Sequence, residues 1–429
     1  MKEPSRRIAG RRRIAVGGAL FILLAVLVFA GTALTSVGTA PVLASTDPLP
    51  SPSPSPSPSA APVVTCEISD ATAVYGQDLT VHGAVTPAPA AGQEIDITVA
   101  GAVVKTIATD AAGLFSAQFT ARRGGAVVAQ MIASPDPISS APITLVVCPR
   151  VVSLKVAKAY PFLLTNCMLR LAPHSYKGFV NVRVVHRGRL VATLKGRCKN
   201  GAVKFALPTP GIGSFSLAFS TQPVASLGLA GAKTHATLKV SWQKVAVGSK
   251  GPYARGLLLR LAALKIHIPG LAWSISSDAG DAIVAFQKAY RLPRTYVVNY
   301  DDWCKLDSAT VLKPHSKAKG THIEIEKGRQ ILMVAHDGKL VGLIAVSTGR
   351  TGNTPVGKFR IHGKSPASSS SYGPGVLWRC MGFYGNFAIH GYVPVPPYPA
   401  SHGCVREPVW AANWTYTRSF VGEDVFIYN

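Results

Sequence analysis

Short runs in which apolar and polar residues alternate dominate residues 63–149. Ile95 to Val99, Val103 to Ile107 and Leu114 to Phe119 are examples, and Gly, Pro and Asp residues separate the runs. Alternation with a period of two places one side of a strand in a core, and many short strands with frequent turns are typical of a β-sandwich. Residues 150–246 continue the same pattern. We therefore expect two consecutive β-sandwich domains.

The spacing of apolar residues changes after residue 246. Leu257, Leu261 and Leu264 recur at helical intervals, and a second helical stripe contains Phe286. This pattern predicts a small three-helix module over residues 250–310.

Alternating runs return in residues 320–429. Hairpin turns of the kind that need positive φ are expected at Lys327-Gly328 and at Asp337-Gly338. The segment is therefore predicted to form a β-rich C-terminal domain. With the two sandwiches and the helical module, this makes the chain multidomain and mainly β.

The first 44 residues have the pattern of an export signal. A basic segment that ends at Arg13 precedes an uncharged apolar run from Ile14 to about Leu34. The run is longer than the roughly 7–15 residues of a cleaved signal and close to the roughly 20 that span a bilayer. We therefore expect residues 1–44 to form a cytoplasmic basic segment and a membrane anchor, with the rest of the chain outside the cytoplasm. Cleavage near Val42-Leu43-Ala44 and secretion are the alternative.

Residues 45–62 are rich in Ser and Pro and contain Ser-Pro repeats. This composition cannot bury a core and favours extended polyproline II structure. We expect a spacer that lifts the following domains away from the membrane.

The chain has a formal net charge of +25, and the imbalance is greatest in the second predicted sandwich. No Asp or Glu occurs between Arg150 and Val245. Such a surface attracts polyanions. Because the export signal places the chain outside the cytoplasm, the expected partners are anionic wall polymers or phospholipid head groups, and not nucleic acid. A basic face that serves only solubility is the alternative.

The strongest candidate chemistry lies in the segment Ser401-His402-Gly403-Cys404-Val405-Arg406, with His390-Gly391 fourteen positions before the cysteine. A thiol attacks an amide as its thiolate, and a nearby imidazole and positive charge lower the thiol pKa. We therefore predict Cys404 as the nucleophile and His390 as its base. The carbonyl of Gly391 is expected to hold the other ring nitrogen of His390.

The remaining polar groups of this segment have expected roles as well. The amides of Gly403 and Cys404, with the His402 ring nearby, predict a hole for a tetrahedral oxyanion. Arg406 either orients the loop or meets a substrate carboxylate. A zinc site would need a fourth ligand at suitable spacing, which the segment lacks. No motif implies a metal, nucleotide or other cofactor.

These residues resemble the signature of the L,D-transpeptidase (YkuD-type) catalytic domain. Ser347-Thr348-Gly349, Thr354 to Phe359 and Phe387 to Gly391 also fall where that family places similar segments, and the resemblance covers residues 321–428. The loop from Tyr392 to Ala400 departs from the family because it is rich in Pro and apolar residues. The departure puts the acceptor side of the site in doubt.

The preceding domains have looser resemblances. Gly280 to Gln287 is similar to part of the three-helix peptidoglycan-binding domain. Both predicted sandwiches resemble the immunoglobulin-like spacer domains of wall proteins.

The resemblance implies a reaction on peptidoglycan, with stem peptides and glycan strands as partners. Cys404 would attack the third residue of a tetrapeptide stem, expel D-alanine and form a thioester. An amine of a neighbouring stem would then give a 3→3 cross-link, whereas water would give carboxypeptidase activity and a protein amine would give protein attachment. A role in cell-wall organisation and cell shape, and a covalent carbapenem adduct at Cys404, follow from the same resemblance. A non-catalytic wall-binding protein is the alternative.

The resemblance also implies where the substrate binds. The segment from Gly363 to Trp378 resembles a mobile cap over the site. The side chains expected to contact substrate are Arg406, Ser401, Tyr372, Trp378, Phe383 and Tyr384.

Seven cysteines in an exported chain leave one unpaired. With Cys404 reserved as the free thiol, we expect pairing within each sandwich. The remaining pair would join the helical module to the catalytic domain. The expected disulfides are Cys66–Cys148, Cys167–Cys198 and Cys304–Cys380.

Overall fold

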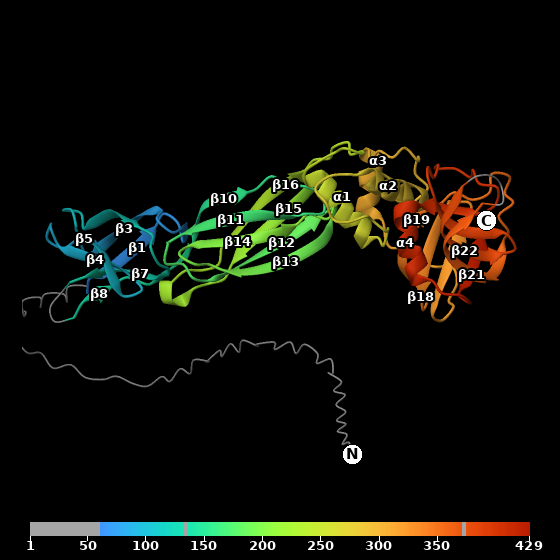
Figure 1. The fold of residues 1–429 in the computed structure, drawn as a ribbon. Coiled ribbons are helices and arrows are strands. Elements are labelled where there is room, and N and C mark those ends of the chain that lie inside the picture. Colours follow the sequence, from blue (N-terminus) through green and yellow to red (C-terminus); the bar gives the residue numbers. More distant parts are fainter. Residues whose placement is uncertain (1–60, 133–135, 371–374) are drawn as a thin grey trace, which may run out of the picture. The chain divides into compact units, whose positions relative to one another are not determined.

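The computed structural model describes residues 61–132, 136–370 and 375–429 (Figure 1). Strands predominate over helices in these residues, which confirms the prediction of a mainly β chain. The predicted anchor at 1–44 lies outside the described residues, as does the spacer at 45–62 apart from its last two positions. Within the described part of the chain, no helix has both the length and the apolar character required to cross a membrane.

Residues 63–148 fold into two sheets that enclose a core. One sheet has the order β1-β3-β6 and the other β2-β9-β7-β4-β5, with β8 paired to β7. Ile95, Ile97 and Val99 alternate with more exposed residues along β4 and are at most 2% exposed, as the sequence pattern predicts. The strands are β1 Val63–Ile68, β2 Thr72–Val74, β3 Asp78–Thr86, β4 Glu94–Val99, β5 Ala102–Ala108, β6 Leu114–Thr120, β7 Gly125–Met131, β8 Ile138–Ser139 and β9 Ile143–Cys148.

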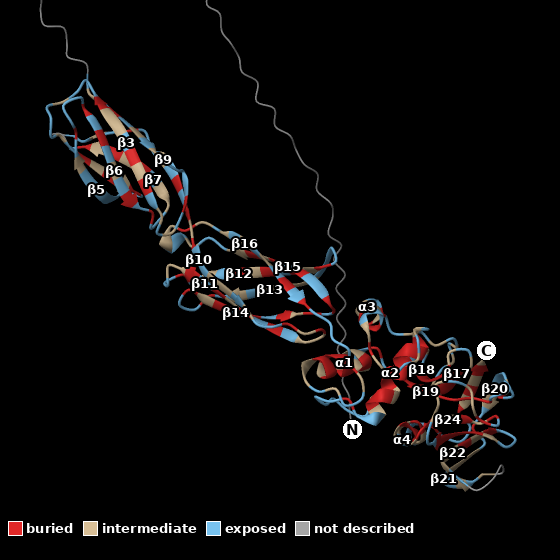
Figure 2. Ribbon diagram, turned by 90° about the horizontal axis from the view of Figure 1, so that it is seen from above, coloured by how far each residue is buried: buried red, intermediate tan, exposed pale blue. Residues whose placement is uncertain are grey.

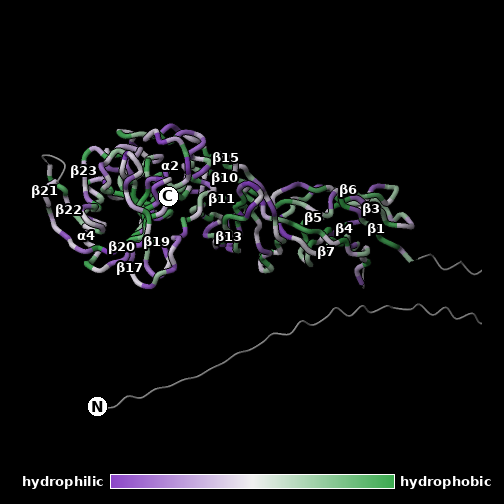
Figure 3. Tube along the Cα trace, turned by 90° about the vertical axis from the view of Figure 1, so that its right-hand side faces the viewer, coloured by the Kyte–Doolittle hydropathy of each residue, from purple (hydrophilic) through white to green (hydrophobic). Residues whose placement is uncertain are grey.

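Residues 150–240 form a second pair of sheets, with the orders β10-β11-β14 and β13-β12-β15-β16. Alternate residues of β12 and β15, such as Val182 and Leu217, are fully buried between the sheets. Figure 3 shows apolar positions (green) running along the strands of both sandwiches. The elements are β10 Arg150–Val156, β11 Leu164–Ala172, β12 Phe179–His186, β13 Arg189–Arg197, β14 Ala202–Pro208, β15 Gly213–Thr221, the 3-10 helix η1 Ala225–Leu227 and β16 Lys233–Val240.

Three helices follow, in the region where helical spacing begins in the sequence. They are α1 Pro252–Ala263, α2 Ser277–Ala289 and α3 Tyr300–Ser308. The Ser276 side chain caps α2 by accepting from the Ala279 amide at 3.1 Å. Asn299 and Asp302 form a capping box at the start of α3.

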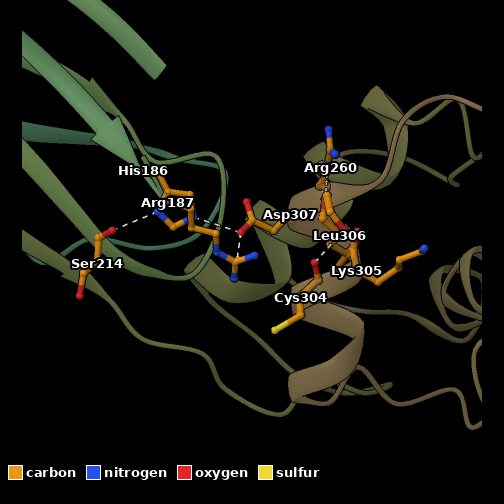
Figure 4. A network of polar contacts seen from close by, with 9 residues as sticks. His186, Arg187, Ser214, Arg260, Cys304, Lys305, Leu306 and Asp307 are labelled. Carbon is orange, nitrogen blue, oxygen red and sulfur yellow. Dashed lines mark hydrogen bonds and ion pairs between the residues drawn. The ribbon is translucent and has the colours of Figure 1, made fainter. Parts of the chain in front are cut away.

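A polar network links the second sandwich to α3 (Figure 4). His186, at the end of β12, is 6% exposed, and its Nε2 lies 3.1 Å from Asp307 Oδ2. Its Nδ1 lies 3.0 Å from the Ser214 carbonyl, and Arg187 Nη2 lies 3.2 Å from the same Asp307 oxygen. Nearby, Arg260 donates to the Leu306 carbonyl at 2.8 Å. Asp307 therefore joins two regions of the chain that are separate in the sequence.

The C-terminal domain contains two sheets and a helix. The sheets have the orders β19-β18-β17-β25-β20 and β21-β22-β23-β24. The elements are β17 Thr321–Glu326, β18 Ile331–His336, β19 Lys339–Ala345, β20 Gly357–Arg360, β21 Gly363–Ser369, β22 Val376–Tyr384, β23 Phe387–Tyr392, β24 Val405–Pro408, α4 Val409–Arg418 and β25 Asp424–Tyr428.

Strand β18 is buried on both sides (Figure 2). Ile331 and Met333 share a core with the helical module, whereas Leu332 and Val334 belong to the core of the C-terminal domain. Lys288 of α2 crosses this boundary and donates to the Val346 carbonyl at 2.7 Å. The helical module thus covers one face of the first C-terminal sheet.

The predicted disulfides are wrong, because all seven cysteines are free thiols. Cys148 contacts the Gly231 carbonyl of the following sandwich at 3.2 Å, whereas the neighbours of the Cys66 thiol are Ser140 and Ala129. Cys304 lies on α3, whereas Cys380 lies on β22 within electrostatic reach of Cys404. Cys304 and Cys380, which the cysteine count predicted as a pair, therefore have different neighbours.

Candidate active site

Two parallel strands bring the predicted nucleophile and base together. β23 pairs with β24 so that His390 is opposite Arg406. Cys404 directly precedes β24 and lies two residues before Arg406, which places the two side chains on the same face of the sheet. Arg406 acts electrostatically on both Cys404 and His390. The three predicted residues thus share one face of the sheet.

Hydrogen bonds hold the turn that carries Cys404. Ser401 Oγ accepts from the Gly403 amide at 3.0 Å and donates to the Cys404 carbonyl at 2.5 Å. Thr354 Oγ1 donates to the Gly403 carbonyl at 2.7 Å, and Asn353 Nδ2 donates to the His402 carbonyl at 2.7 Å. These contacts fix the turn from both sides.

This arrangement changes two predicted roles. Ser401, expected to contact substrate, is 4% exposed and supports the turn instead. The Gly403 amide, expected in the oxyanion hole, already donates its hydrogen bond to Ser401 Oγ. Gly403 has another requirement: its φ is +136°, and a Cβ there would come within 2.1 Å of the Phe387 ring.

The imidazole of His390 is held in one tautomer. The ring is buried, and its Nδ1 lies 3.0 Å from the Gly391 carbonyl, the contact that the sequence predicts. Because a carbonyl oxygen only accepts, Nδ1 carries the hydrogen and Nε2 of the neutral ring is left with a free lone pair. Burial and the charge of Arg406 lower the pKa of His390 from its ordinary value, against the opposing effect of the Gly391 carbonyl.

The thiol of Cys404 differs from expectation. Burial raises its pKa above the ordinary value, although the Ala388 amide and the Arg406 charge act in the opposite direction. The expected net lowering of the thiol pKa is therefore wrong for this resting site, because desolvation outweighs the nearby positive charge. Cys404 and His390 are both neutral near pH 7, so the resting pair is a thiol and a neutral imidazole.

Arg406 supports the surroundings of Cys404. Its Nη1 donates to the Ala400 carbonyl at 3.2 Å, which is one of the two roles that the sequence predicts. Its guanidinium lies 4.1 Å from the centroid of the Tyr392 ring, and that ring makes an edge contact with His390. Arg406 thus anchors the loop from Tyr392 to Ala400 beside the base.

A pocket of about 410 Å³ lies next to Cys404. Asn386 and Ala388, which line it, also contact Cys404: the Asn386 carbonyl lies 3.7 Å from Sγ. The other lining residues are His362, Gly363, Lys364, Ser365, Ser368, Ser369, Leu377, Cys380, Gly382, Gly385 and Phe387. Hydroxyl groups and short side chains predominate in this lining.

The segment predicted as a cap is mostly a hairpin of β21 and β22. Trp378 lies on β22 and packs against Gly391, beside the base. Phe383, expected in the substrate groove, is 3% exposed and belongs to the core. Tyr384 is exposed and packs against Phe387, whereas Tyr372 lies outside the described residues.

Sequence reasoning missed several supporting residues. The family resemblance includes Thr354 only as part of a longer segment, and its contact with the Gly403 carbonyl joins two segments far apart in the chain. Phe387 packs over Gly403, and Cys380 lines the pocket. Nothing in the local pattern indicates these contacts. In the described part of the chain, no group of three or more His, Cys, Asp and Glu side chains is arranged to hold a metal ion.

Comparison with known proteins identifies the C-terminal domain. Residues 320–427 match the family model of the L,D-transpeptidase catalytic domain (YkuD). A solved L,D-transpeptidase from Xylanimonas cellulosilytica is 33% identical over 44% of this chain and 98% of its own, with a TM-score of 0.42. The chain belongs to the L,D-transpeptidase family through this domain.

Other solved L,D-transpeptidases are also similar to the chain. The catalytic domain from E. faecium is 21% identical over 27% of this chain and all of its own, with a TM-score of 0.24. An L,D-transpeptidase from Mycobacterium smegmatis is 10% identical over 66% of this chain and 99% of its own, with a TM-score of 0.25. No curated protein matches the chain.

Proposed function

We propose that this L,D-transpeptidase acts on peptidoglycan in the cell envelope, with Cys404 as the nucleophile. The observation that carries the proposal is the fixed tautomer of His390, whose Nδ1–H is held by the Gly391 carbonyl on the strand next to Cys404. A base held in this way presents Nε2 to a neighbouring thiol.

The proposed reaction has two steps. Sγ of Cys404 attacks the carbonyl of the third residue of a tetrapeptide stem while its proton passes to His390. The amine of the leaving D-alanine takes that proton, and a thioester remains. The side-chain amine of a neighbouring stem then attacks the thioester and restores the thiol, which gives a 3→3 cross-link.

The turn that holds Cys404 would stabilise the negative charge that develops on the carbonyl oxygen during attack. The Cys404 amide and the His402 ring stay the proposed contributors to the oxyanion hole, because the Gly403 amide is engaged by Ser401. Arg406 acts through the loop and through its charge, which favours the thiolate as it forms.

The test uses the full-length protein and purified tetrapeptide stems, with D-alanine and cross-linked products measured by mass spectrometry. Cys404→Ser is expected to lower D-alanine release by at least about 10³-fold, since the hydroxyl is a much weaker nucleophile at neutral pH. Cys304→Ser, which changes a thiol on α3, is the matched control and should keep wild-type release.

The products separate the remaining possibilities. Release of D-alanine with cross-linked dimers supports the transpeptidase. Release without dimers identifies a carboxypeptidase or an enzyme that uses a protein amine. An inactive wild-type protein that still binds wall fragments would refute catalysis and identify a wall-binding protein.

A further inference from the structure

The second sandwich carries an exposed sheet face with unbalanced positive charge. Buried residues alternate with more exposed ones along β12 and β15 of the sheet β13-β12-β15-β16 (Figure 2). One side of this sheet therefore faces the core and the other faces solvent. No Asp or Glu occurs between Arg150 and Val245, so any charged side chain on the solvent side is basic or a histidine. We name the five exposed basic residues of this face the basic track: Arg183, Lys195, Arg197, Lys233 and Lys239.

The strand register places the basic track on both sides of a column of small residues. Strand β15 runs through the middle and presents Ser214, Ser216, Ala218 and Ser220 to the solvent side. Ala218 lies between Arg183 of β12 and His235 of β16.

The same pattern repeats along the strand. Ser220 lies between Asn181 and Lys233, and Lys195 pairs with Asn181 from the far side. Ser214 pairs with Lys239 at the other end. Neighbouring strands are about 4.8 Å apart and alternate residues about 7 Å apart, so the cations stand at regular intervals beside β15.

These charges have no carboxylate partners within the described residues. Among the described residues, the carboxylate contacts of this sheet are those that His186, the last residue of β12, and Arg187, the next residue, make with Asp307. Lys195 instead lies over the Phe179 ring at 4.3 Å from the centroid. The positive potential of the basic track is therefore not neutralised from within.

A pocket of about 480 Å³ continues the basic track at one end. Ser214 and Lys239, the last register pair, line it together with Lys158 and Ser241. Its lining includes no acidic side chain. Two lysines and the Ser214 hydroxyl in the lining of one hollow are suited to an anionic group with several oxygens, while the Ser241 hydroxyl is engaged with the Tyr253 hydroxyl at 2.7 Å.

We propose that the basic track binds a linear, phosphodiester-linked polyol polymer of the cell wall. The phosphates would meet the cations on β12, β13 and β16, and the polymer backbone would follow the small side chains of β15. The serine hydroxyls can donate to phosphate oxygens along its length. The proposal rests on the proposed function only for its compartment, the cell envelope.

Two features favour this polymer over other polyanions. Single-stranded nucleic acid needs aromatic rings on which its bases stack, whereas the Phe179 ring is covered by the Lys195 ammonium. A planar bilayer would meet the long side chains first and leave β15 without contacts. A flexible chain can lie between the two rows of cations.

The test measures how tightly two triple variants of the full-length protein bind purified poly(glycerol phosphate), and compares both with the wild type. One variant changes the basic track, with Arg183→Gln, Lys195→Gln and Lys233→Gln. The matched control removes the same charge from the other sheet, with Lys155→Gln, Arg170→Gln and Lys204→Gln, all at exposed positions. Thermal melting checks that both fold.

The track variant is expected to bind about 100-fold more weakly at low ionic strength, because each of the three basic residues contributes about 1 kcal/mol of binding free energy near an anionic surface. The slope of log affinity against log salt should fall by about 2, for three lost phosphate contacts. The control should lose less than about threefold.

Equal losses in both triple variants would overturn the proposal, because they would show general charge attraction. Equal or tighter binding to anionic phospholipid vesicles or to a single-stranded oligonucleotide of matched phosphate content would overturn the choice of partner. Cys404→Ala should bind the polymer normally, and the track variant should release D-alanine normally. A failure of the catalytic proposal is thereby separate from a failure of this one.

Discussion

Glu407 lies beside the candidate active site with its carboxyl group fully buried. It is the β24 residue opposite Gly391, and its Oε2 accepts from Thr415 Oγ1 at 2.8 Å. Its Oε1 has no hydrogen-bond partner among the described residues. Burial raises the pKa of Glu407 from 4.5 to about 8, which means that the folded protein holds this carboxyl protonated at neutral pH.

This proton links the stability of the domain to pH. The folded-state pKa is above the unfolded value, so the contribution of the protonated group is fully present below pH 4.5 and is lost as the pH rises toward 8. Each pKa unit corresponds to about 1.4 kcal/mol, so the loss by pH 8 is on the order of 4 kcal/mol. Glu407→Gln keeps an acceptor for Thr415 and removes the ionisation.

We expect the variant and the wild type to unfold with similar free energies near pH 4.5, with the variant more stable by about 4 kcal/mol at pH 8. Urea unfolding at a series of pH values measures this, with the catalytic transition identified by loss of hydrogen-exchange protection in β23 and β24. Glu67→Gln, the same change at an exposed site of the first sandwich, is the control for unfolding followed in β23 and β24. A difference between Glu407→Gln and wild type that stays constant from pH 4.5 to 8 would refute the reasoning.

Two further predictions concern the catalytic pair and the junction at α3. Because the pKa of Cys404 is raised and that of His390 is lowered, iodoacetamide should alkylate Cys404 slowly at pH 7 and faster above pH 9. His390→Gln should abolish D-alanine release but hardly change the rate of this alkylation. Rapid alkylation at pH 7 that depends on His390 would indicate an ion pair instead. Asp307→Asn should weaken the contact with His186 and Arg187 by about 1–3 kcal/mol. Hydrogen exchange measures this as faster exchange of the backbone amides in α3, and unchanged exchange would contradict the prediction.

The sequence predicted the features that depend on local patterns. Alternation located the strands of both sandwiches, and Asp337-Gly338 forms its turn with positive φ at both residues. The turn after β17 is longer than expected, and Gln330, not Gly328, has the positive φ. The Gln330 side chain compensates by donating to the Lys327 carbonyl at 2.6 Å, a contact that no turn rule indicates.

In the active site, the sequence predicted which residues meet but not their electrostatics. The motif located Cys404, His390 and the Gly391 carbonyl, because these depend on spacing within one segment. The pKa of the thiol depends on how deeply the fold buries it, and cysteine counting cannot determine which thiols lie together. The supporting contacts of Thr354 and Phe387 arise from tertiary packing, which local patterns do not contain.

Because β18 is buried on both sides, the segment that matches the family is smaller than the part of the chain that packs around its core. The family match begins at residue 320, yet Ile331 and Met333 lie in a core completed by α1, α2 and α3. A gene rearrangement that moved residues 320–429 alone into another protein would transfer every catalytic group and leave an apolar sheet face uncovered. Such a domain is expected to be inherited together with its helices, so that recombination boundaries fall before residue 252 and not at residue 320.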